Sequence, residues 1–81
     1  MTHYEFLRTE KDADAVLAVF NENGIYVNDL EQLEPECAAI AACKTPEIMA
    51  RRLADSSFIV GLDWYPDALE WVSKEMFAGH I

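Results

Sequence analysis

The strongest structural signals of the chain lie in TPEIMARRLADSSFIVGL, residues 45–62. Thr45 can cap a helix, and Pro46 suits the first helical position because that position needs no N–H donor. Two serines, residues 56–57, would end this helix. The continuous apolar run Phe58–Leu62 then predicts a strand that is buried on both faces.

The helix over residues 46–55 is expected to have a core face and a solvent face. We place five side chains: Ile48, Met49 and Leu53 toward the core, and Arg51 and Arg52 toward solvent. The two arginines also raise the hypothesis of a small helix-turn-helix DNA-binding regulator that uses residues 45–53. The turn before this helix lacks the usual glycine, and a net negative chain repels phosphate, so this interpretation is a remote alternative.

Upstream, the pattern predicts a strand, a helix and a second strand. Residues 2–8 alternate polar and apolar side chains, as a half-buried strand does. Thr9 can cap a helix that ends near Gly24, a natural left-handed stop. Apolar residues in this helix recur at helical spacing: Ala13, Val16, Leu17 and Phe20. The β-branched residues within 25–27 predict that the chain then enters a strand.

Prolines divide the remaining segments. Pro35 would clash with the carbonyl of Glu31 inside a helix that began at Asn28, so we expect a short turn near residues 29–33 and a new helix over 35–44. A last helix is expected from Pro66 to about residue 78, with Gly79 as its stop.

The predicted order is therefore strand, helix, strand, two helices, strand, helix. This order indicates an α+β fold in which about four helices cover a two- or three-stranded sheet. The alternative is an all-helical bundle in which the apolar runs are extended connections. Residues 1–81 are expected to form a single domain, because the chain is too short for two.

Composition excludes several protein classes. The chain carries 15 acidic and 6 basic residues, for a net charge of −9, yet 52% of its residues are hydrophobic, which favours a folded domain over an acidic disordered tail. No apolar run approaches the ~20 residues of a membrane span, and the first residues lack the basic segment and apolar core of a secretory signal. We therefore expect a cytoplasmic protein whose two cysteines, Cys37 and Cys43, are buried thiols.

The sequence shows no arrangement typical of an enzyme or a metal site. The two histidines, His3 and His80, lie near opposite ends, and together with the cysteines they lack the spacing of a zinc site. The three glycines are isolated, which argues against a phosphate-binding loop. We expect a protein that is not an enzyme and that uses no cofactor or metal.

The acidic residues carry the main functional prediction. Residues 12–43 hold seven acids and no Lys or Arg: Asp12, Asp14, Glu22, Asp29, Glu31, Glu34 and Glu36. This pattern favours a carboxylate-rich face that binds a basic protein surface without contacting nucleic acid directly. Carboxylates along helices can imitate phosphates, so we expect an inhibitor or accessory factor of a nucleic-acid-handling partner, such as a nuclease or an anti-phage effector complex.

An aromatic interface is the main alternative. Trp64, Tyr65 and Trp71 surround the start of the last predicted helix, and such residues are enriched at binding hot spots. In this interpretation the chain is an adaptor or a homodimer, and its acidic surface serves solubility.

Overall fold

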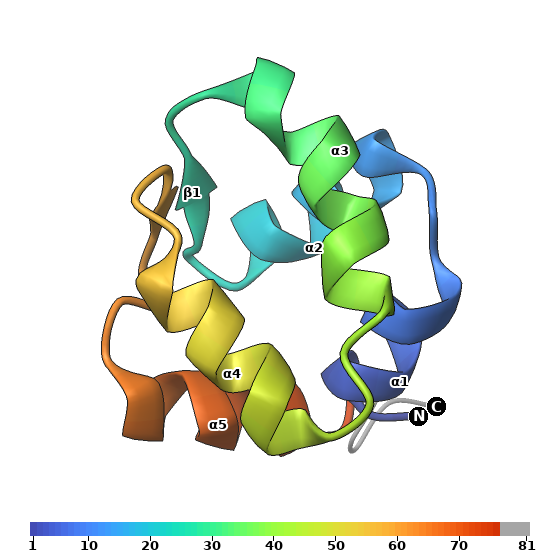
Figure 1. Cartoon of the computed structure of the whole chain (residues 1–81), viewed down its shortest axis with the longest axis vertical. Coiled ribbons are helices and arrows are strands. Elements are labelled where there is room, and N and C mark those ends of the chain that lie inside the picture. The colour runs from blue at the N-terminus through green and yellow to red at the C-terminus, as the bar shows by residue number, and fades with distance from the viewer. Residues whose placement is uncertain (77–81) are drawn as a thin grey trace.

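Seven elements follow one another in the computed structural model, which describes residues 1–76 (Figure 1). The helices are α1 (His3–Thr9), α2 (Ala13–Glu22), α3 (Leu30–Ala41), α4 (Pro46–Asp55) and α5 (Tyr65–Ser73). The strands β1 (Tyr26–Val27) and β2 (Ile59–Val60) form one antiparallel sheet. The fold is a helix-rich mixture of helices and strands, with one helix more than expected and a two-stranded sheet, the smaller of the two expected sizes.

The first segment is a helix, so the predicted strand over residues 2–8 is wrong. Thr2 and Glu5 form a capping box, in which the Glu5 N–H donates to Thr2 Oγ1 at 3.1 Å and the Thr2 N–H donates to Glu5 Oε1 at 2.7 Å. This reciprocal pair satisfies two donors that a helix start would otherwise leave free. α1 then buries His3 and Leu7, which are four residues apart and so share a face.

Helix caps also differ from the expected ones. Asp12, rather than Thr9, caps α2 and accepts the Asp14 N–H at 3.0 Å. Thr9 instead ends α1, where its hydroxyl donates to the Glu5 carbonyl at 3.1 Å. Asp29, rather than Asn28, caps α3. An aspartate caps as well as an asparagine, so only the local backbone decides which neighbour takes the position.

Pro35 lies inside α3 and does not divide it, which corrects the predicted break. Proline there removes one hydrogen bond, the one that the Glu31 carbonyl would accept. That carbonyl belongs to the exposed first turn, where water can replace the lost donor. Burial of Leu33, Cys37 and Ile40 along one face of the helix offsets the cost.

β1 and β2 form a two-residue ribbon that is buried on one face only. Tyr26 pairs with Val60 and Val27 pairs with Ile59. Ile59 is buried, whereas Val60 is 44% exposed, so the expected strand over residues 58–62 is neither long nor covered on both faces. The alternation follows from the pleat, which turns neighbouring side chains to opposite faces.

α4 and α5 pack directly against each other beneath this ribbon (Figure 1). Ala50 of α4 and Ala68 of α5 are both fully buried, and small side chains let two helix backbones approach closely. Met49 and Leu53 face the core as expected. Ile48 does not, since it is 54% exposed, because the helix turns Ala50 inward instead.

α5 ends earlier than predicted. Its last helical residue is Ser73, and the N–H of Lys74 closes the final turn by donating to the Trp71 carbonyl. Glu75 then forms an isolated antiparallel β-bridge with Thr2, which takes the chain away from the axis of α5. The predicted series of apolar residues at helical spacing therefore does not continue as a helix. The predicted stop at Gly79 lies outside the described residues. No helix within residues 1–76 is long and apolar enough to cross a membrane.

Gly61 gives a direct test of the ribbon geometry. Its φ is +116°, and an added Cβ would lie 3.1 Å from the Gly24 carbonyl oxygen. Gly24 also has a positive φ, +77°, but a Cβ there would meet nothing within 4 Å. We expect Gly61→Ala to lower the free energy of unfolding by about 2–4 kcal/mol and Gly24→Ala by about 1 kcal/mol, measured by urea denaturation with circular dichroism. Equal costs for the two variants would contradict the close approach.

Candidate functional site

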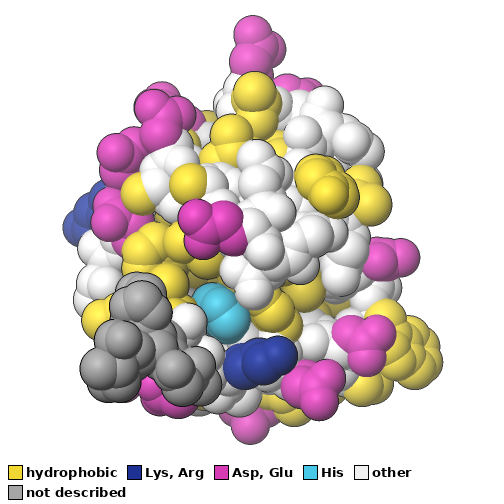
Figure 2. Space-filling view, turned by 180° about the vertical axis from the view of Figure 1, so that it is seen from behind, with side chains coloured by type: hydrophobic (Ala, Val, Ile, Leu, Met, Phe, Trp, Pro, Cys, Tyr) yellow, Lys and Arg dark blue, Asp and Glu magenta, His cyan; other side chains and the backbone are white. Residues whose placement is uncertain are grey.

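Carboxylates from two separate parts of the chain converge around the buried thiol of Cys37. Burial raises the pKa of this thiol, and the negative charges of Glu36, Glu34, Asp12 and Glu10 raise it further. α3 packs against both α1 and α2, and Glu34 lines one cavity with Arg8 and Lys11, so the α1–α2 link and its acids lie beside α3. Figure 2 shows Asp and Glu side chains gathered along the edge that carries this link.

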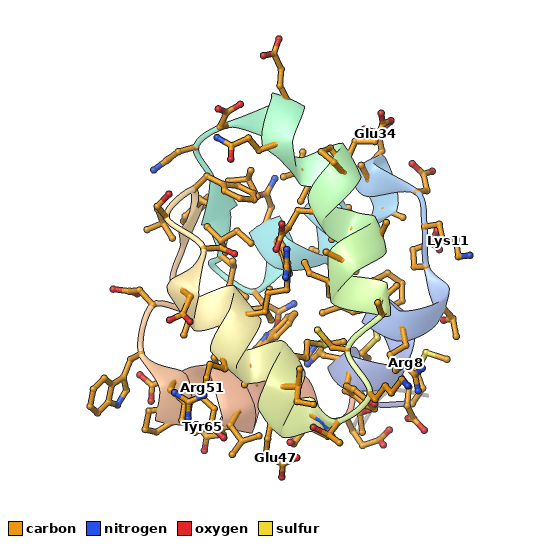
Figure 3. All side chains as sticks on the ribbon, in the orientation of Figure 1. Arg8, Lys11, Glu34, Glu47, Arg51 and Tyr65 are labelled. Atoms are coloured by element: carbon orange, nitrogen blue, oxygen red, sulfur yellow. The ribbon has the colours of Figure 1, made fainter. Side chains whose placement is uncertain are left out.

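We call Glu10, Asp12, Asp14 and Glu34 the acidic patch. Asp14 follows Asp12 in the first turn of α2, and its side chain is exposed, as is that of Glu34. Glu10 and Asp12 each accept a backbone N–H, so they are held in place. Figure 3 shows Glu34 at the end of the molecule where α2 begins, with Lys11 and Arg8 farther along the same side.

The other predicted acids are placed differently. Glu36 is bound to Arg52, which donates from Nε at 2.6 Å and from a terminal nitrogen at 3.1 Å. Asp29 is occupied as the α3 cap, where it accepts the Glu31 N–H and a Gln32 side-chain N–H. Glu31 is exposed in the first turn of α3.

Glu22 belongs to another surface. It lies at the opposite end of α2 from Asp14 and lines a cavity of about 330 Å³ together with His3 and Glu75. The seven predicted acids therefore do not share one face, because the two ends of α2 present their side chains to different sides of the molecule.

The predicted aromatic cluster is also divided. Trp71 turns toward α1, where its ring stacks on His3 with centroids 4.0 Å apart and planes 8° apart. Trp64 is 64% exposed and contacts neither ring, while Tyr65 lies beneath the guanidinium of Arg51. Trp64 instead stands at the N-cap of α5.

Sequence reasoning missed the exposed apolar face of the ribbon. Tyr26 and Val60 are direct cross-strand partners, and both are exposed. Leu30, which follows β1 closely, is exposed as well. The signal was present in residues 25–27, because a half-buried strand must turn one of three successive apolar residues outward.

Both arginines of the suggested DNA-binding helix contact other residues of the protein. Arg52 binds Glu36, and the guanidinium carbon of Arg51 lies 4.3 Å from the Tyr65 ring centroid. Arg52 is therefore already neutralised by Glu36, which weakens the helix-turn-helix interpretation.

His3 is a core residue rather than a frayed end. It is 4% exposed, and its Nδ1 lies 2.8 Å from the Trp71 carbonyl oxygen. A carbonyl can only accept, so Nδ1 carries the proton and donates. Burial is the main reason that the pKa of His3 lies below its ordinary value of 6.5, and the nearby Lys74 lowers it further, while the bond to Trp71 acts in the opposite direction.

The cysteines and carboxylates of residues 1–76 provide no evident reactive centre. Cys37 and Cys43 are free and buried, and burial raises the pKa of both thiols. A thiol with a raised pKa is a poor nucleophile and a poor metal ligand at neutral pH. In this part of the chain no three metal-ligating side chains lie close enough together to hold an ion.

No protein-family model, curated protein or solved structure matches this chain. The functional argument therefore depends on the geometry described above.

The burial of His3 predicts a pH-dependent stability. Its pKa is lower in the folded protein than in the unfolded chain, so unfolding takes up a proton. The contribution of neutral His3 is complete above pH 6.5 and is lost as the pH falls below that value. Glu22, Lys74 and Glu75 are the charged groups that line the same cavity as His3.

We expect the urea midpoint of the wild type to fall between pH 7.5 and 5.5, and the fall to be smaller in His3→Phe, which keeps a ring against Trp71. His80→Gln is the matched control and should behave as the wild type. An equal fall in His3→Phe would show that another group causes the pH dependence.

Proposed function

We propose that this chain is a non-enzymatic protein-binding module whose acidic patch binds a basic surface on a partner. The observation that carries the proposal is the packing of α3 against α1 and α2, which brings the acids of the α1–α2 link beside Glu34. Asp12 and Glu34 are 22 residues apart in the sequence, so it is the fold that brings their charges together.

The exposed members of the patch are available to a partner. The side chains of Asp14 and Glu34 form no ion pair within residues 1–76. A net charge of −9 on so small a protein adds a long-range field that speeds encounter with a basic surface. The local patch then determines where on the protein the contact forms.

A nucleic-acid-handling protein is the partner class that fits this chemistry. Such proteins expose Lys and Arg to neutralise phosphates, and a row of carboxylates can occupy the same surface. In this role the chain acts as an inhibitor or an accessory factor that competes with nucleic acid. The buried thiols and the engaged His3 support a binding role rather than catalysis, because none of them is free to react.

A second candidate interface is the exposed apolar edge of the ribbon, formed by Tyr26 and Val60. Two large apolar side chains that are exposed and face each other across the strands favour a protein contact. This edge would support an adaptor role or a homodimer. The two candidates differ in salt dependence, because apolar contacts persist at ionic strengths that screen charges.

Charge reversal tests the acidic patch. We expect Asp14→Lys/Glu34→Lys to abolish capture of the partner from a lysate of the source cells, with the bound proteins identified by mass spectrometry. Capture by the wild type should be lost in high-salt washes and should decrease when DNA is added as a competitor. The expected weakening is about 100-fold, since reversal replaces two favourable charge contacts by repulsion.

The matched control is Asp55→Lys/Glu70→Lys, which changes the net charge equally on α4 and α5. These two residues are exposed and lie outside the patch. The control should capture the partner almost as well as the wild type. If both double variants lose the partner equally, net charge rather than the patch controls binding. If neither loses it, the apolar edge is the better candidate.

A further inference from the structure

The turn that ends α2 contains an asparagine followed by a glycine, Asn23 and Gly24. Both residues are exposed, and Figure 1 shows α2 leading through this short turn into β1. Gly24 carries no side chain, and the space where one would stand is open. The approach of the Asn23 side chain to the backbone nitrogen of Gly24 is therefore not hindered by a neighbouring side chain.

The reaction available to this pair is deamidation of the asparagine. The Gly24 nitrogen attacks Cγ of Asn23, a carbon–nitrogen bond forms, the Cγ–Nδ2 bond breaks, and ammonia leaves with the proton of the Gly24 nitrogen. Water then opens the resulting cyclic imide at one of its two carbonyls. One product is aspartate, and the other is isoaspartate, in which the backbone continues through the former side chain. Water is the only molecule that enters and ammonia the only one that leaves, so the reaction needs no oxidant or reductant.

Two hydrogen bonds of the folded turn oppose this reaction. Nδ2 of Asn23 donates to the Val19 carbonyl at 2.7 Å, and the Gly24 N–H donates to the Asn21 carbonyl at 3.2 Å. The first bond holds the leaving group toward α2, and the second directs the N–H of the nucleophile toward another carbonyl. Both bonds are lost before the Gly24 nitrogen reaches Cγ, so the reaction requires the turn to open locally.

The reaction would weaken the end of α2. The Val19 carbonyl is one of the last carbonyls of this helix, and the Asn23 side chain supplies its donor. A carboxylate at residue 23 cannot donate, and its charge stands at the negative end of the helix dipole. Asn23 also lines the cavity that contains Glu22 and Glu75, so the new charge would be a third carboxylate there, against one lysine.

The isoaspartate product would also disturb the entry into the ribbon, because it adds one carbon atom to the backbone between α2 and β1. Ile25, directly after the turn, is buried, and its N–H donates to the Phe20 carbonyl at 2.9 Å. The Gly24 carbonyl oxygen lies so near Gly61 that an added Cβ there would come within 3.1 Å of it. A longer backbone displaces the turn from both neighbours.

We propose that Asn23 is a site of spontaneous deamidation that the folded turn restrains and whose products weaken the end of α2. A molecule in which the turn opens is modified, and the modified turn opens more readily. Because ammonia is lost, the change does not reverse, so it limits the lifetime of the intact fold. This site is separate from the acidic patch and does not depend on the function proposed for it.

Peptide mapping by mass spectrometry tests the restraint. The wild type is incubated folded and, in parallel, unfolded in guanidinium chloride at the same mildly alkaline pH. Trypsin then releases residues 12–44 as one peptide, because this stretch contains no Lys or Arg before Lys44. We expect Asn23 to deamidate about tenfold more slowly in the folded protein, since two hydrogen bonds must first be lost.

Asn21 and Asn28 lie in the same peptide and serve as internal controls, since each is followed by an acidic residue instead of glycine. Both should remain unmodified while Asn23 reacts, and Asn23→Gln should remove the signal. Equal rates in the folded and unfolded protein would overturn the proposal. So would the absence of any reaction at Asn23 in the unfolded chain.

The consequence is tested with Asn23→Asp, which reproduces the aspartate product. We expect the equilibrium constant of unfolding, measured by urea denaturation, to rise about tenfold, because a hydrogen bond is lost and a charge is added at the negative end of α2. The matched control is Asn28→Asp, which changes the net charge equally but places it just before α3, at the positive end of that helix. The control should be at least as stable as the wild type. Equal destabilisation in both variants, or none in Asn23→Asp, would contradict the proposed effect on α2.

Discussion

The close packing of α4 against α5 is the constraint on which the other features depend. The two helices pack together, and their buried faces include two fully buried alanines, Ala50 and Ala68. β2 and the loop after it connect these helices, which places the ribbon beside their contact. The same packing turns Ile48 outward and sets Arg51 over Tyr65. The cavity of about 520 Å³ between α4 and the start of α5 is therefore a consequence of how the core is filled.

A second contact joins α1 to the end of α5. His3 stacks on Trp71, donates to its carbonyl, and receives support from its own backbone N–H, which donates to the Lys74 carbonyl at 3.0 Å. A neutral imidazole can make this contact at low cost, whereas a charged one would have to lose its hydration. This contact joins segments nearly seventy residues apart in the chain. Because it favours a neutral imidazole, the stability of the fold also depends on pH.

The acidic residues divide into those that stabilise the fold and those that remain available for binding. Asp12 and Asp29 cap helices, Glu36 neutralises Arg52, and Asp14 and Glu34 remain free. A capping carboxylate must accept backbone N–H groups, so its orientation is fixed by the helix start rather than by a partner. Candidate binding residues are thus those acids that the fold does not already use.

The sequence alone determined the elements whose causes are local. Thr45 and Pro46 start α4 at the expected position, Gly24 ends α2, and the mixed helix and strand character follows from apolar spacing. The strand predicted at residues 2–8 was wrong although the correct signal is also local, because Thr2 and Glu5 already form the sequence pattern of a capping box. Only the tertiary structure decided that Pro35 stays within α3, since burial at Leu33 and Ile40 is a long-range effect. It also decided which acids lie close together and which arginine forms an ion pair, Arg52 rather than Arg51. These outcomes depend on distances between segments, which the spacing of residues along the chain does not give.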